Sequence, residues 1–378
     1  MGHRHARLDL RTQKNRSWEE SMSRVILTLV AFVALLLGPA SVAAAAEGSA
    51  GAVYTLTNTT ANAVIVYDRS ASGALAWSGT FPTGGSGGPL GSQGAVVISD
   101  DGRWLYAVDA GSNDVAVFEI TKDGLTWSDR IASGGTQPVS VTASHDLVYV
   151  VNAASSNIAG FRSNDGKLSP IAGSIRTFAG SGAAQIQFSP SGRALVVTEK
   201  TTSTLDVFIV GKDDAAGPAT SYASSGTTPF GFAFGRHDDL VVSEAAGAAP
   251  LSAASSYELS KDGTLTAVSR SVPTTQAAAC WVAVTKDGRY AFTANAASDS
   301  ISAFSVDKDG ALTLVFAQAA HSTGAHTTDM ALTENSRYLY ANDGGTHMIS
   351  AFRVGADGSL TRLPGVTTPV GASGLTAQ

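Results

Sequence analysis

Short apolar runs, separated by small or polar residues, repeat along most of this 378-residue chain. One stretch shows the unit most clearly: apolar runs cover 95–99, 104–108 and 115–120, and Asp123 and Gly124 follow the third run. Asp-Gly between alternating apolar runs is a strong hairpin signal, because the turn needs a residue that accepts a positive φ. We therefore predict short antiparallel β-strands over these runs.

The unit recurs along the chain, and one aromatic residue in its third run marks each copy at intervals of 43 to 51 residues. A period in this range is typical of β-propellers, because a four-stranded blade cannot bury its own faces and must stack on neighbours. The sequence predicts an all-β fold, a seven-bladed β-propeller of four-stranded antiparallel blades. The markers are Tyr67, Phe118, Phe161, Phe208, Tyr257, Phe304 and Phe352.

The two ends of the repeat suggest how the ring closes. Blade 1 begins at Val53 with a run that matches the second strand of the unit, so its inner first strand is missing there. The tail, residues 370–378, has the length and position to supply that strand. We predict that it completes blade 1, which would remove exposed strand edges. A frayed tail is the alternative.

Residues 1–46 lie outside the repeat and resemble a secretory signal peptide. A basic segment ends at Arg24, the apolar run 25–37 follows, and Ala44 and Ala46 occupy the −3 and −1 positions of a cleavage site. The run is short for a membrane span. We expect cleavage near Ala46, a secreted protein, and no membrane insertion after cleavage; a retained anchor helix is the alternative.

A leader that begins at Met22 would have a conventional length, so residues 1–21 can also be explained by a start site assigned too far upstream. No charged or Pro-rich linker interrupts the rest. We therefore expect residues 47–378 to form a single propeller domain.

Charge limits the classes of partner that the protein can bind, and the cysteine count limits its disulfides. Removing the leader leaves 19 basic and 28 acidic residues, a net charge near −9. Nucleic acids and anionic membranes both require a basic surface, so neither is expected as a partner. Cys280 is the single cysteine and excludes an intramolecular disulfide. We expect a monomer that can take a small carboxylated or polyhydroxylated molecule.

Polar residues end the second strand of every blade. In an antiparallel blade these ends share one face with the connectors between blades, here named the connector face, and the Asp-Gly turns lie on the opposite turn face. Asn and Asp at such ends commonly bond local backbone, but Glu does so poorly. Glu199 and Glu244 are therefore the ring members that turn chemistry explains least. The ring is Thr57, Asp109, Asn152, Glu199, Glu244, Asn295 and Asp343.

Further polar residues lie in the connectors and would meet at the channel mouth on this face. Such a mouth could hold a small polar ligand. We assign catalysis to Glu199, Glu244 and His326. The alternative is that the glutamines satisfy backbone groups inside the channel and that the tryptophan packs. The proposed substrate-binding residues are Gln93, Gln137, Gln185, Trp281 and Asp343.

Metal and cofactor chemistry has little support in the sequence. His321, His326 and His347 with Asp343 are the only plausible metal set, and their spacing matches no compact ligand motif. Phosphate-loop, dinucleotide and nucleophile-elbow motifs are absent. We expect no metal site and no cofactor, although binding near the three histidines stays open.

Three units carry a family resemblance: Leu-Tyr-Ala-Val-Asp at 105–109, Val-Tyr-Val-Val-Asn at 148–152 and Tyr-Leu-Tyr-Ala-Asn at 338–342. They resemble the lactonase family of seven-bladed propellers, which includes propeller-type 6-phosphogluconolactonases and carboxymuconate lactonising enzymes and is related to Tyr-Val-Thr-Asn repeat proteins. The resemblance covers residues 52–378.

The resemblance implies a site that combines a His at a strand start, Arg residues and a Glu at the end of a second strand. Glu199, in 196–200, matches that Glu. The strand start at 182–185 carries no His, and no Arg stands at a matching position. The chain therefore looks like a secreted, divergent branch, for which a phosphorylated substrate is not expected.

Two main functions stay open, beside a metal-dependent activity. The first is a lactonase-like or cyclase-like enzyme for a small non-phosphorylated lactone, with Glu199 as general base. The second is a non-catalytic propeller that binds an extracellular ligand or a protein, since the family's His and Arg are missing here.

Overall fold

The computed structural model describes residues 49–236, 238–246, 251–321 and 326–378. The predicted leader and its cleavage site, within residues 1–48, lie outside the described residues. The described chain forms β-strands and no helix, and it therefore contains no helix that could cross a membrane.

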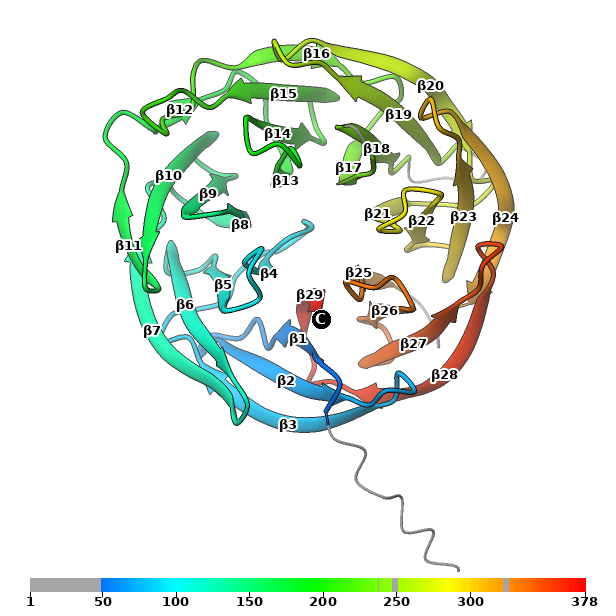
Figure 1. Ribbon diagram of the computed structural model, residues 1–378, viewed down its shortest axis with the longest axis horizontal. Helices are drawn as coiled ribbons and strands as arrows, with labels where there is room; N and C mark the ends of the chain where they lie inside the picture. The colour runs from blue at the N-terminus through cyan, green and yellow to red at the C-terminus, as the bar shows by residue number, and fades with distance from the viewer. Residues whose placement is uncertain (1–48, 237, 247–250, 322–325) are drawn as a thin grey trace, which may run out of the picture. The chain divides into compact units, whose positions relative to one another are not determined.

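Seven antiparallel sheets form a ring (Figure 1), which confirms the predicted all-β, seven-bladed propeller. Innermost strand first, the strands of blades 1 to 3 are β29 (Ser373–Ala377), β1 (Ala52–Leu56), β2 (Ala63–Arg69) and β3 (Leu75–Pro82); β4 (Val96–Ile98), β5 (Trp104–Asp109), β6 (Asp114–Thr121) and β7 (Gly124–Ala132); and β8 (Pro138–Ser144), β9 (Leu147–Asn152), β10 (Asn157–Asn164) and the short outer strands β11 (Lys167–Pro170) and β12 (Arg176–Thr177).

The remaining blades follow the same order. Those of blades 4 and 5 are β13 (Ala183–Phe188), β14 (Ala194–Glu199), β15 (Thr204–Ile209) and β16 (Thr220–Ala223); and β17 (Pro229–Phe234), β18 (Asp239–Glu244), β19 (Ala253–Leu259) and β20 (Leu265–Pro273). Those of blades 6 and 7 are β21 (Ala279–Val284), β22 (Tyr290–Asn295), β23 (Ser300–Val306) and β24 (Leu312–His321); and β25 (Thr327–Leu332), β26 (Tyr338–Asp343), β27 (Met348–Val354) and β28 (Leu360–Thr367).

The hydrophobic core lies between blades. All seven aromatic markers fall in third strands and are at most 3% exposed. Apolar clusters join neighbouring blades, as where Val53 and Ile65 of blade 1 pack with Tyr340 and Ile349 of blade 7. Each blade therefore depends on its two neighbours for burial of its faces.

The C-terminal tail closes the ring as predicted. Strand β29 pairs antiparallel with β1, and Val53 lies opposite Ala377. Just beyond this pair, the Gln378 amide donates to Ala52 O at 2.9 Å, and Arg69 Nε donates to Gln378 O at 2.9 Å. The two ends of the described chain are thus held in one blade.

Asp329 fastens the closing strand from the next blade. It is fully buried in β25, where Oδ1 accepts the Met330 amide at 2.7 Å and Oδ2 accepts the Leu375 amide of β29 at 2.9 Å. Burial raises the pKa of Asp329 well above its usual range, and the two amides oppose that shift.

We expect Asp329→Ala to lower the free energy of unfolding by at least about 2 kcal/mol, because each buried N–H without an acceptor costs roughly 1–3 kcal/mol. Urea titration measures the loss. Asp68→Ala, at an exposed position of β2, is the control and should change stability little. Equal effects of the two substitutions would contradict the role given to Asp329.

Candidate functional site

The polar ring lies at the ends of the second strands, as predicted, but six of its seven members are buried; Thr57 is partly exposed. The connector that enters a blade lies directly over that blade's ring residue. A Cβ added at Gly180 would overlap the Glu199 carboxylate, and one added at Gly226 would overlap that of Glu244. Glycine is needed there because the backbone comes so close. The structure thus places both glutamates under connector backbone and not on an open surface.

Third-strand residues bond to the ring carboxylates. In blade 5, Ser255 Oγ donates to Glu244 Oε1 at 2.5 Å. In blade 7, Ser350 Oγ donates to Asp343 Oδ2 at 2.5 Å. The corresponding position of blade 4, opposite Val197 in the register, is Asp206, which has no hydroxyl to donate. Blade 4 therefore holds two buried carboxyl groups.

These two carboxyl groups share an unusual environment. Glu199 and Asp206 are at most 1% exposed. Thr202 donates to Glu199 Oε2 and Ser221 donates to Asp206 Oδ1, each at 2.5 Å, while Glu199 Oε1 and Asp206 Oδ2 find no donor among the described residues. Burial raises the pKa of Glu199 to about 7, and the neighbouring Asp206 contributes to the rise. A proton held between the two groups would give both oxygens a partner.

The channel mouth on the connector face is crossed by residues 89–93, which lead into β4. In Figure 1 the segment before β4 reaches into the middle of the ring. The Gln93 side chain bonds both backbone groups of Val282 in β21, with Nε2 to the carbonyl at 2.7 Å and Oε1 to the amide at 2.9 Å. Its own amide donates to Ala184 O of blade 4 at 3.1 Å. The segment that leads into blade 2 is thus bonded across the channel to blades 4 and 6.

The other proposed binding residues near the mouth hold backbone groups as well. Gln185 bonds the amide and carbonyl of Phe232 at 2.7 and 2.8 Å. Trp281 Nε1 donates to Ser92 O at 3.0 Å, and Gln137 Nε2 donates to Pro89 O at 3.1 Å. These contacts match the alternative in which the glutamines satisfy backbone groups and the tryptophan packs.

Lys200 supplies a positive charge at the mouth that sequence reasoning missed. Its Nζ donates to Gly91 O and lies 4.8 Å from the centre of the Phe230 ring. Burial lowers the pKa of Lys200, and burial raises the pKa of the Cys280 thiol to about 12. In the sequence, the only indication of a role for Lys200 was its position directly after Glu199.

A cavity of about 260 Å³ lies inside the channel beneath Gln93. Amides, hydroxyls and apolar side chains line it, together with the carboxylate of Asp100, and none of its described lining residues is basic. Such a wall suits a small polar molecule better than a phosphorylated one.

The proposed catalytic histidine lies apart from these groups. His326 is exposed in the connector into blade 7, with φ near 80°, and its backbone amide meets Asp299 Oδ1 at 3.0 Å. Among the described residues, no three His, Cys, Asp or Glu side chains gather closely enough to hold a metal ion.

Comparison with known proteins gives the family. The family model described as "Lactonase, 7-bladed beta-propeller" matches residues 47–178 and 242–374. A search of curated proteins finds no match.

Solved structures share the fold at low identity. A proposed 6-phosphogluconolactonase from Bacteroides fragilis is 18% identical, with 87% of this chain and 98% of that chain covered and a TM-score of 0.68. The periplasmic gluconolactonase of Pseudomonas aeruginosa is 15% identical, with 86% and 99% covered and a TM-score of 0.67. At these identities the likeness establishes the fold alone.

The carboxyl pair of blade 4 predicts a pH dependence of stability. The pKa of Glu199 is raised in the folded protein, so the protonated carboxyl favours the folded state. This contribution to the free energy of unfolding is fully present below the usual pKa near 4.5 and is lost as the pH rises through about 7. We expect the free energy of unfolding of the wild type to fall relative to Glu199→Gln over this window, by up to about 3 kcal/mol. The amide can still donate to Asp206 but cannot ionise.

Urea titrations at several pH values measure this difference. Glu258→Gln, at an exposed position of β19, should keep the wild-type dependence. A wild-type slope that persists in Glu199→Gln would show that the pair does not share a proton.

Proposed function

The chain belongs to the lactonase family of seven-bladed β-propellers, and we propose that it is a secreted protein that opens or forms a small, non-phosphorylated lactone at the channel mouth. Its expected substrate is uncharged or carboxylated. The lining of the channel cavity, without a basic residue among those described, supports a substrate that lacks a phosphate.

One observation carries the proposal. Glu199, at the strand end where the family resemblance implies an acid, is a buried carboxyl whose pKa is raised to about 7. A carboxyl with a pKa near the working pH accepts a proton from water most effectively. Perturbed carboxyls of this kind gather at functional sites. In the proposed reaction Glu199 is the general base for the attacking water.

Lys200 is the proposed electrophilic partner. Lactone opening places negative charge on the carbonyl oxygen, and a fixed positive charge stabilises it. Lys200 follows Glu199 directly and reaches the mouth at Gly91. It would take the part that Arg and His residues have in the family pattern. The other assignments made from the sequence stay proposals: Glu244 as a second acid, His326 in the connector into blade 7, and a set of binding residues, Gln93, Gln137, Gln185, Trp281 and Asp343.

Access to this site requires movement. The connector at Gly180 covers Glu199, and residues 89–93 cross the mouth. The enzyme function therefore includes displacement of one or both segments before water and substrate meet Glu199.

That cover is also the observation that favours a second function. A mouth crossed by a segment that is bonded in place suits a non-catalytic propeller that binds an extracellular ligand or a protein with its outer surfaces. In that case the carboxyl pair serves the stability of blade 4 alone.

We expect the purified leader-free protein to turn over at least one member of a panel of uncharged and carboxylated lactones, and to leave phosphorylated lactones unchanged. Because a general base contributes typically 10²–10⁴-fold, Glu199→Gln should lower kcat by about 100-fold or more. Product formation is followed by pH-stat titration or mass spectrometry.

Glu258→Gln is the control and should keep wild-type turnover. Turnover that survives Glu199→Gln would remove Glu199 from the mechanism. A protein that turns over no lactone, but carries a saturable ligand in native mass spectrometry, would support the binding function.

Secretion is tested separately from chemistry. In a bacterial host, mass spectrometry of the exported protein should give Glu47 as its first residue, because small residues at −3 and −1 direct cleavage. Ala46→Arg should leave the leader attached. Export with residues 25–37 retained would favour the anchor helix.

A further inference from the structure

A recurring joint holds the blades together on the turn face. In six blades the turn between the third and fourth strands contains a glycine with positive φ, and in five of them an apolar side chain of the preceding blade packs against it so closely that a Cβ there would overlap it. These pairs are Phe81 with Gly124, Trp104 with Gly166, Ile209 with Gly263, Tyr290 with Gly358, and Tyr338 with Gly73.

Three of the joints use the aromatic residue that begins a second strand, and in each an arginine lies over the ring. Arg103 lies 4.7 Å from the centre of the Trp104 ring. The corresponding distances are 5.8 Å for Tyr290 and 5.7 Å for Tyr338. Such cation–π contacts stabilise a ring in a fixed position.

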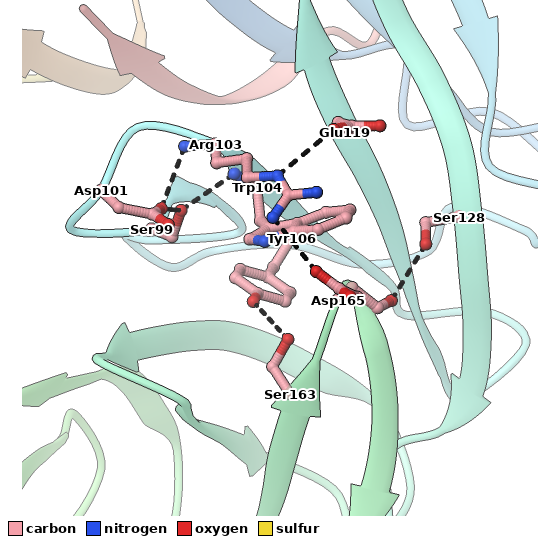
Figure 2. Close-up of polar contacts among 10 residues, drawn as sticks. Ser99, Asp101, Arg103, Trp104, Tyr106, Glu119, Ser128, Ser163 and Asp165 are labelled. Atoms are coloured by element: carbon pink, nitrogen blue, oxygen red, sulfur yellow. Dashed lines mark hydrogen bonds and ion pairs between the residues drawn. The ribbon is translucent and has the colours of Figure 1, made fainter.

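Figure 2 shows the joint between blades 2 and 3. Arg103 extends over Trp104 and pairs with Glu119 of its own blade at 3.3 Å and with Asp165 of blade 3 at 3.1 Å. A planar aromatic group between a turn glycine and a guanidinium is thus the occupant that this joint is built to accept.

Among the described residues, none supplies a ring to the joint between blades 5 and 6. Asp239 begins β18 at the position of Trp104, Tyr290 and Tyr338 in their strands. Gly310 keeps the positive φ of the other turn glycines, yet a Cβ added there would lie 3.4 Å from the nearest Asp239 atom, in ordinary contact. A short side chain therefore stands where three other joints have a ring.

A cavity of about 300 Å³ lies at this joint. It is lined by two carboxylates, three cations and apolar and small residues, among them Arg236, Asp239, Arg289, Asp307, Lys308 and Gly310. This volume is at the lower end of small-molecule sites, which run from roughly 300 to 1,000 Å³. It suits a molecule of one or two fused rings.

The cations at the cavity are not equally engaged. Arg289 Nε pairs with Asp287 Oδ2 at 2.5 Å, and its guanidinium lies over Tyr290. The side chains of Arg236 and Lys308 make no hydrogen bond or ion pair with the residues that the structure describes. Both are exposed at the rim, where they can meet an anion.

We propose that this cavity binds a planar aromatic carboxylate. The ring takes the place of the missing tryptophan or tyrosine beside Gly310, and Arg236 and Lys308 hold the carboxylate. The site lies on the turn face, opposite the channel mouth, so it is independent of the proposed lactone chemistry.

Isothermal titration calorimetry, with 2-naphthoate added to the leader-free protein, tests the proposal by measuring the heat of binding. We expect one saturable site with a submillimolar Kd. Cyclohexanecarboxylate, which has the charge but no planar ring, should bind at least about tenfold more weakly, because ring stacking is lost. Equal binding of both anions, or no saturable heat up to millimolar concentrations, would overturn the proposal.

Variants locate the site. Asp239→Tyr should fill the cavity as Tyr290 fills its own joint and weaken binding at least about tenfold, whereas Asp239→Asn should keep it within about threefold. If Asp239→Tyr does not fold, the double variant Arg236→Gln and Lys308→Gln, at two exposed positions, should weaken binding by the same factor.

Arg337→Gln is the control, because Arg337 is an exposed arginine in the turn before Tyr338 of blade 7, where that ring already fills the joint. It should leave the Kd unchanged. Wild-type affinity in both Asp239→Tyr and the double variant, or loss of affinity in Arg337→Gln, would place 2-naphthoate elsewhere.

Discussion

The pairing of β29 with β1 is the interaction on which the rest of the structure depends. A propeller blade buries its faces only against its neighbours, so an open ring would expose two blade faces and two strand edges. The closing strand brings the last residues of the chain beside the first described ones, and Asp329 of blade 7 holds it from the side. Because this pairing closes the ring, every blade packs against a neighbour on each of its two faces.

The close approach of connector backbone to the strand ends decides where polar groups can lie. On the connector face, glycines such as Gly180 and Gly226 let the chain pass over buried carboxylates. In blades 5 and 7 a serine hydroxyl donates a hydrogen bond to the buried carboxylate and partly offsets the loss of its hydration. Blade 4 has a second acid in place of the serine, and burial, together with that acid, raises the pKa of Glu199 to about 7. A carboxyl with a pKa near neutrality is what a general base needs.

Much of the fold was predictable from the sequence, because its signals are local. The spacing of the aromatic markers, the Asp-Gly turns and the missing first strand of blade 1 each follow from residues near one another in the chain. The ring of second-strand ends was predictable for the same reason. The seven positions are the structural equivalents that the alignment of repeats predicts.

The chemistry of those positions was not predictable in the same way. Gln93 bonds to Val282, 189 residues away, and this contact holds residues 89–93 across the channel mouth. The pairing of Glu199 with Asp206 depends on register across two strands and on the connector above them.

By itself, then, the sequence determined the number of blades and the strand order within each, because short-range turn and alternation patterns encode them, and it showed that blade 1 lacks a first strand near the start of the repeat. Only the tertiary structure decided which polar side chains are buried, which are bonded across the channel and which joint lacks its ring. Those outcomes depend on distances between blades that no local pattern records.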